Sequence, residues 1–93
     1  MKIIVSSKQL AVKLNEFDFE NDSIQAVRAE KSNLYLDSQK KTVEIWCEIT
    51  EFRARVVQEG VRWDWLKNLV NKVDEQPVVL EITKDCVKVI FHY

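Results

Sequence analysis

Few side chains in this 93-residue sequence are of types that commonly do chemistry. Cys47, Cys86 and His92 could act as nucleophiles or bind zinc, but zinc sites normally use closely spaced ligand pairs, and these residues are dispersed. Neither cysteine has a neighbouring histidine, and the sequence contains no glycine-rich phosphate loop. Asp18 and Glu20 belong to an acidic loop and carry no acid-base signal of their own. We therefore predict a non-enzymatic protein without metal or cofactor.

The two cysteines have a different interpretation. Cys47 and Cys86 each lie in a strand-like stretch beside valine and isoleucine. Free cysteine behaves as a small apolar residue when it is buried. We expect both thiols to be buried and inert rather than joined in a disulfide or reactive.

Tryptophan supplies the clearest candidates for a protein interface. Strand alternation places Trp46 on a polar face with Glu44 and Glu48, and exposed tryptophan is enriched at binding hot spots. Trp46 is thus the leading candidate, and a locally covered side chain is the alternative. Trp63 and Trp65 are about 200° apart on a helix, so both cannot point inward. We expect Trp63 in the core and Trp65 at its boundary or on a contact surface.

Two arginines form a second candidate surface. Arg53 and Arg55 alternate on one face of an expected strand beside Phe52, an arrangement that could bind an anion, nucleic acid or a protein. Cross-strand pairing with carboxylates such as Glu44 and Glu48 explains them equally simply. We favour that pairing.

Composition limits the class of protein. A length of 93 residues fits one domain with a single core, and 46% hydrophobic content argues against intrinsic disorder. The net charge of −1 offers no general attraction to nucleic acid or anionic membranes. The first residues are too soon polar for a signal peptide, and no apolar run is long enough to cross a membrane. We expect a cytoplasmic protein without a membrane or small-molecule partner.

The elements of the first half follow from periodicity and capping signals. An apolar strand at 2–5 leads into Ser6 to Gln9, which matches a capping box, with Val5 and Leu10 as a hydrophobic staple. The sequence predicts a helix from Ser7 to about Phe17, with Leu10, Leu14 and Phe17 on its apolar face. Strands are expected at 24–30, 33–37 and 42–49, joined by short polar turns.

The second half repeats this order. The apolar parity shifts at 50–51, so that Phe52, Ala54 and Val56 should form the inner face of a new strand. After Gly60 a second helix is expected, and Pro77 prevents its continuation. Its apolar stripe consists of Trp63, Leu66, Leu69, Val70 and Val73. The last elements are strands at 78–83 and 86–92.

The resulting pattern is two βαβββ halves, 1–49 and 50–93, of which the second lacks its last strand. With Met1 to Val5 leading into Ser7 to Leu10, the 23–37 hairpin, and the 61–73 helix followed by the 77–91 hairpin, it resembles one domain of the bacterial sliding clamp. The resemblance implies an α+β fold with two helices packed on antiparallel sheets. It also implies an open sheet edge where the last strand is missing.

In sliding clamps the helices face DNA, so the resemblance implies contacts with the DNA backbone from lysines on the two helices. These are Lys8, Lys13, Lys67 and Lys72. Lysine neutralises phosphate and supplies affinity without sequence preference. Glu16 and Asp64 lie on the same faces, however, and we favour an ordinary solvated helix surface.

These observations predict a non-enzymatic binding or assembly module with a sliding-clamp-like fold. Its partner would be another protein or a second copy, engaged through the open edge or through Trp46. DNA association is an additional hypothesis. The alternative is a small regulatory or protein-interaction domain of the same fold with no DNA role.

Overall fold

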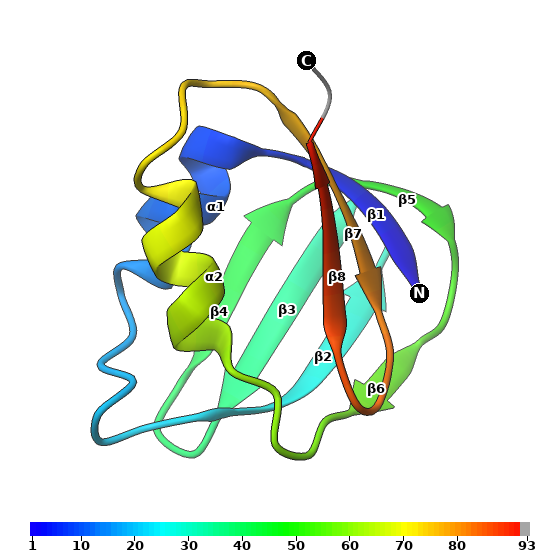
Figure 1. Cartoon of the computed structure of the whole chain (residues 1–93). Coiled ribbons are helices and arrows are strands. Elements are labelled where there is room, and N and C mark those ends of the chain that lie inside the picture. The colour runs from blue at the N-terminus through cyan, green and yellow to red at the C-terminus, as the bar shows by residue number, and fades with distance from the viewer. Residues whose placement is uncertain (92–93) are drawn as a thin grey trace.

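Two helices and two antiparallel four-stranded sheets make up the computed structural model, which describes residues 1–91 (Figure 1). The predicted α+β class is confirmed. The strands are β1 (Lys2–Ser6), β2 (Ile24–Glu30), β3 (Asn33–Ser38), β4 (Thr42–Trp46), β5 (Glu48–Glu51), β6 (Arg55–Val57), β7 (Pro77–Ile82) and β8 (Val87–Phe91). The helices are α1 (Ser7–Leu14) and α2 (Trp63–Val70).

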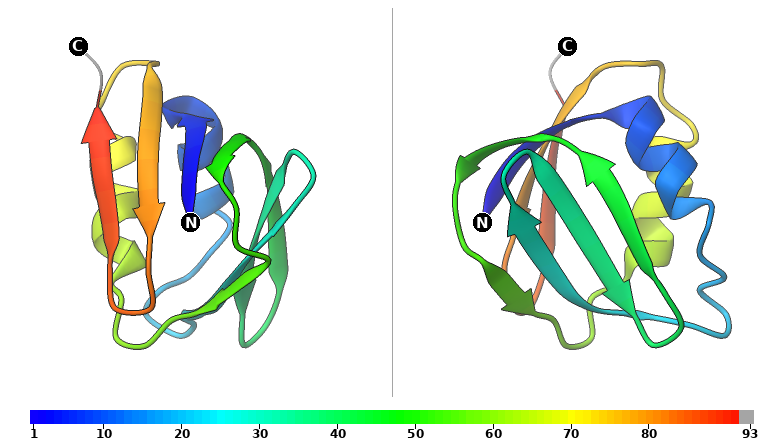
Figure 2. Two further views of the ribbon diagram at one scale, coloured as in Figure 1. Left: turned by 90° about the vertical axis from the view of Figure 1, so that its right-hand side faces the viewer. Right: turned by 180° about the vertical axis from the view of Figure 1, so that it is seen from behind.

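The sheets combine strands from both ends of the chain. Sheet A has the order β5-β1-β7-β8, and sheet B has the order β4-β3-β2-β6. β1 pairs with β7, and β6 pairs with β2. The strand before each helix thus pairs with the strand that follows the other helix. The sheets stand on either side of a shared core (Figure 2).

One connection between the sheets differs from the sequence prediction. A single strand was expected at 42–49, but it divides at Cys47 into β4 of sheet B and β5 of sheet A. The Cys47 N–H donates to the Ser32 carbonyl at 2.9 Å, at the end of the β3–β4 pairing. Two residues further on, Ile49 lies opposite Ile3 of β1. The chain therefore changes sheets without a loop.

Helix α1 begins where its capping signal predicts. Ser6 is the N-cap, and its hydroxyl oxygen accepts a 3.3 Å hydrogen bond from the Gln9 N–H. Leu10, Leu14 and Phe17 are buried as predicted, whereas the helix itself ends at Leu14. The apolar face of α1 thus lies against the core.

Helix α2 is shorter than predicted. Trp63, Leu66 and Val70 are buried, but the helix ends at Val70 and Asn71 caps it by donating to the Lys67 carbonyl at 2.7 Å. The helices lie side by side (Figure 1), and the side chains of Asn15 and Asn71 exchange hydrogen bonds of 3.1 and 2.9 Å. Neither helix in residues 1–91 has the length and apolar character needed to cross a membrane.

The region before β6 contradicts the predicted alternation. Regular strand structure starts only at Arg55, and Phe52 and Ala54 are exposed rather than part of an inner face. Val56 alone of the three is buried. The edge strand of sheet B on this side is therefore short, since β6 has three residues.

Candidate protein-interaction site

The outer edge of β8 presents backbone groups without a strand partner in the described chain. The Met1 amino group donates to the Ile82 carbonyl at 3.1 Å, and the Ile82 N–H donates back at 2.7 Å. The Ile82 backbone groups therefore point toward Met1 and away from β8. Successive residues of an antiparallel strand bond to alternate sides, so the next residue of β7, Glu81, bonds toward β8 and pairs there with Lys88. The residues of β8 on either side of Lys88 then bond in the opposite direction. The backbone groups that point away from β7 are those of Val87, Val89 and Phe91.

The inner side chains of β8 are only partly covered. Val87, Val89 and Phe91 pack against the core but remain half-buried. In sheet B, by contrast, β4 flanks the β2–β3 hairpin beside α1, and Val43 and Ile45 are buried. Within residues 1–91 no strand takes the corresponding place beside the β7–β8 hairpin. This part of the core is therefore accessible from the β8 edge.

A groove of about 290 Å³ lies between α2 and the start of β8. We call it the edge groove; its lining is Gly60, Val61, Arg62, Trp63, Trp65, Leu66, Asp85, Cys86 and Val87. Trp65 is 60% exposed, which agrees with its predicted place on a boundary or contact surface. An apolar side chain next to the β8 edge would find Trp65, Leu66 and Val87 within this groove.

Trp63 occupies the core, as predicted, and is held there by a residue that the sequence did not single out. Its indole N–H donates to the Gln58 side-chain oxygen at 2.7 Å, and the Gln58 amide nitrogen donates to the Thr83 carbonyl at 3.0 Å. Gln58 is buried, and its position directly after Val56 and Val57 was the only sequence signal available. These bonds tie the start of α2 to the end of β7.

The four candidate lysines do not form a free basic track. The Lys67 ammonium donates to the Phe17 carbonyl at 2.8 Å, and Lys13 pairs with Glu16 at 3.9 Å. Lys8 and Lys72 are exposed. Asp74 and Glu75 lie next to the start of α1, where Ser7 and Ser6 bond to them. These acidic neighbours give the helix pair a surface of mixed charge.

The expected pairing of the two arginines is wrong. Arg55 lies opposite Arg28 of β2, and Glu44 lies opposite Tyr35 of β3, so two strands separate Arg55 from Glu44. Arg53 precedes β6 and does not share a strand face with Arg55. Within residues 1–91 neither arginine has an ion-pair partner.

Both arginines line an open pocket of about 530 Å³. Glu51, Glu81 and Lys84 share its lining. Side chains of both signs thus surround this pocket, which lacks the single sign of charge expected of a phosphate site.

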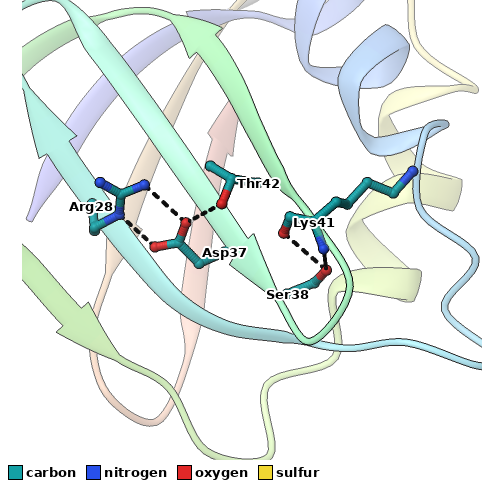
Figure 3. A network of polar contacts seen from close by, with 5 residues as sticks. All are labelled: Arg28, Asp37, Ser38, Lys41 and Thr42. Carbon is teal, nitrogen blue, oxygen red and sulfur yellow. Dashed lines mark hydrogen bonds and ion pairs between the residues drawn. The ribbon is translucent and has the colours of Figure 1, made fainter.

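The carboxylate that an arginine does engage is Asp37. The Arg28 guanidinium donates to it at 2.6 and 3.0 Å, and the Thr42 hydroxyl donates at 2.8 Å (Figure 3). The Arg28 hydrogen bonds lower the pKa of Asp37, although partial burial acts in the opposite direction. Arg28 also stacks over the Tyr35 ring at 4.9 Å. This satisfied network joins β2, β3 and β4 and is structural.

The cysteines differ from each other. Cys47 is buried, as predicted, and burial raises the pKa of its thiol to about 11. Cys86 is exposed, which contradicts the prediction, because β8 starts only at Val87 and Cys86 belongs to the turn before it. In residues 1–91 no group of three or more His, Cys, Asp or Glu side chains is placed to hold a metal ion. His92 lies outside the described residues.

Trp46 lies at the end of β4 on the outer face of sheet B, 65% exposed. Its predicted outward orientation is confirmed. Trp46 does not line the edge groove, which lies beside β8 of sheet A, whereas Trp46 belongs to β4 of sheet B. The two tryptophans therefore mark two separate surfaces.

No family model, curated protein or solved structure matches this chain, so the interpretation of these surfaces rests on their own geometry.

Proposed function

We propose that this chain is a non-enzymatic assembly module that binds an extended strand of another protein chain along β8. The observation that carries the proposal is the combination of outward backbone groups at Val87 and Val89 with an apolar groove beside them. Strand addition uses these two features, since main-chain hydrogen bonds supply affinity and side-chain pockets supply specificity. β8 carries a single charge, Lys88, and so lacks most of the charges that usually protect exposed edges.

The proposal includes a sliding-clamp-like fold, built from a duplicated βαβββ unit whose second half shows no counterpart of β4 within residues 1–91. The exchange of strands supports the duplication, because β1 joins the hairpin of the second half and β6 joins that of the first. Under this proposal a strand from a partner or from a second copy pairs with β8 as β4 pairs with β3.

Two versions of the module differ in whether DNA takes part. A DNA role would use Lys8, Lys13, Lys67 and Lys72 on the helix pair. The bond from Lys67 to Phe17 and the ion pair of Lys13 favour the version without DNA. Salt-dependent retention of duplex DNA decides between them, since phosphate contacts weaken steeply as salt rises.

Strand addition between copies of the chain is tested by the solution mass across concentration, measured by light scattering after size exclusion. Strand addition by another protein is tested by pull-down with mass spectrometry. Proline at Val89 removes an N–H that faces the open edge and so leaves the β7–β8 bonds intact. We expect V89P to lose association that the wild type and the matched V89A variant retain. Association that survives V89P, or that is lost equally in V89A, would refute pairing along β8.

A further inference from the structure

A second groove lies where the end of β4 meets β1 and the start of β7, and no residue of β8 lines it. It measures about 280 Å³, and Trp46 forms one wall. We call it the Trp46 groove; the residues that matter for its chemistry are Ile4, Trp46, Glu48, Glu75, Gln76 and Pro77. It shares no residue with the edge groove.

Its apolar surface can hold a flat or extended group. Ile4 lies on the outer face of sheet A opposite Val79, and Pro77 begins β7 beside it. The Trp46 indole stands next to this surface with most of its area exposed. An aromatic face of this kind attracts cations and planar groups that stack on it.

The charged groups of the groove are carboxylates. Glu48 is exposed and has no ion-pair partner within residues 1–91. The Glu75 carboxylate is fixed in place, because it accepts from the Ser6 hydroxyl at 2.8 Å and from the Lys8 N–H at 3.2 Å. Among residues 1–91, no lysine or arginine lines the groove. Its charge is therefore negative.

One acceptor lacks any donor. The side-chain oxygen of Gln76 is buried without a hydrogen-bond partner in the described chain, while its amide nitrogen donates to the Asp74 carbonyl at 3.2 Å. Buried polar atoms are rarely left unpaired. Its burial keeps this oxygen out of reach of an occupant, so the exposed acceptors of the groove are the Glu48 and Glu75 carboxylates.

We infer that the Trp46 groove binds an arginine side chain of a partner protein. A guanidinium is planar, positively charged and has five N–H donors, so it can stack on the Trp46 indole while donating to the exposed Glu48 carboxylate. Charge complementarity selects this occupant over an apolar or acidic side chain. The inference does not depend on strand addition along β8, because the two grooves use different residues.

The test uses the blocked peptide acetyl-Gly-Arg-Gly-amide, titrated at low salt into ¹⁵N-labelled protein and followed by the Trp46 indole N–H signal and by the backbone N–H signals of Glu48 and Gln76, which remain available in W46A. We expect saturable binding that the citrulline analogue, which has a similar shape but no charge, does not reproduce. A lysine analogue should bind more weakly, since its ammonium cannot stack as a plane. Equal binding of the arginine and citrulline peptides would overturn the inference.

Variants locate the site. W46A and E48Q should each weaken binding about two- to fivefold, the size expected for one exposed cation–π contact or one exposed ion pair. E44Q also removes one negative charge, but from a residue of β4 that does not line the groove, and should have no comparable effect. Peptide binding that is unchanged in W46A, or equally weakened in E44Q and E48Q, would refute the assignment. V89P should bind the peptide like the wild type, which separates this result from the fate of the β8 proposal.

Discussion

The indole nitrogen of Trp63 lies 2.7 Å from the side-chain oxygen of Gln58, and this bond fixes the first turn of α2 to the segment that follows β6. Both residues are buried. The Gln58 amide also reaches the Thr83 carbonyl, so one side chain connects α2, the end of sheet B and the turn of sheet A. The edge groove begins directly beside this connection, with Trp63 in its lining.

Replacing Gln58 by leucine should destabilise the protein by about 1–3 kcal/mol, because the Trp63 N–H would remain buried without an acceptor. Urea unfolding followed by circular dichroism measures this change. The Q58L/W63F double variant should lose less than the sum of the single variants, since it removes both partners. Q9L, at an exposed glutamine of α1, should stay within about 0.5 kcal/mol of the wild type. Additive losses would contradict a direct interaction.

Replacing Ser6 by alanine should cost about 1 kcal/mol, because α1 loses the N-cap acceptor of the Gln9 N–H. Glu75 would also lose the Ser6 hydroxyl, although its bond from the Lys8 N–H remains. Thermal or urea unfolding measures the change. S32A, at an exposed turn serine, is the control, and an equal loss in both variants would argue against a capping role.

Acid should destabilise the fold through Asp37 and Asp22. Hydrogen bonds from Arg28 lower the pKa of Asp37, and one from Ser38 lowers the pKa of Asp22, from an ordinary value of 3.8. A lowered pKa in the folded state means that the unfolded chain binds protons first as pH falls. The stabilisation is therefore present above pH 3.8 and is lost as pH falls through the folded-state pKa values.

The measurement is the free energy of unfolding between about pH 5 and pH 2. D37N and D22N should each flatten its fall with acid. R28Q should flatten it too, because Asp37 then loses the donor that lowers its pKa. Curves for the variants that run parallel to the wild type would contradict this account.

The two thiols should differ sharply in reactivity. Cys86 is exposed, whereas Cys47 is buried and its pKa of about 11 leaves little thiolate at neutral pH. We expect a disulfide reagent such as DTNB to modify one thiol of the native protein, and mass spectrometry to locate it at Cys86. C86S should react only after unfolding. Rapid modification of native C86S would contradict the burial of Cys47.

Local signals in the sequence were sufficient for the start of α1 and for the main buried residues of both helices, but not for the helix ends. Ser6 and Gln9 predicted the start of α1, and the spacing of Leu10 and Leu14 predicted its inner face, because both signals act within a few residues. The end of α2 was misplaced since Asn71 caps it by a bond from its own side chain, which helix periodicity does not detect.

The sequence did not predict which strands are neighbours in the two sheets. The apolar parity continues through Cys47, so nothing in it marks the change from β4 to β5. The cross-strand neighbour of Arg55 depends on which strand lies beside β6, and that strand, β2, is distant in sequence. For the same reason Glu75 and Gln76 could not be placed in one groove with Trp46, although simple alternation did place Trp46 on an exposed face with Glu48.

The position of β1 has a consequence for synthesis of the protein. β1 is made before both of its neighbours, β5 and β7, and Met1 lies 81 positions before its partner Ile82. The nascent chain must therefore carry an unpaired apolar strand, Ile3 to Val5, until β7 has been synthesised. Sheet A cannot complete its strand order during translation before the β7–β8 hairpin is available.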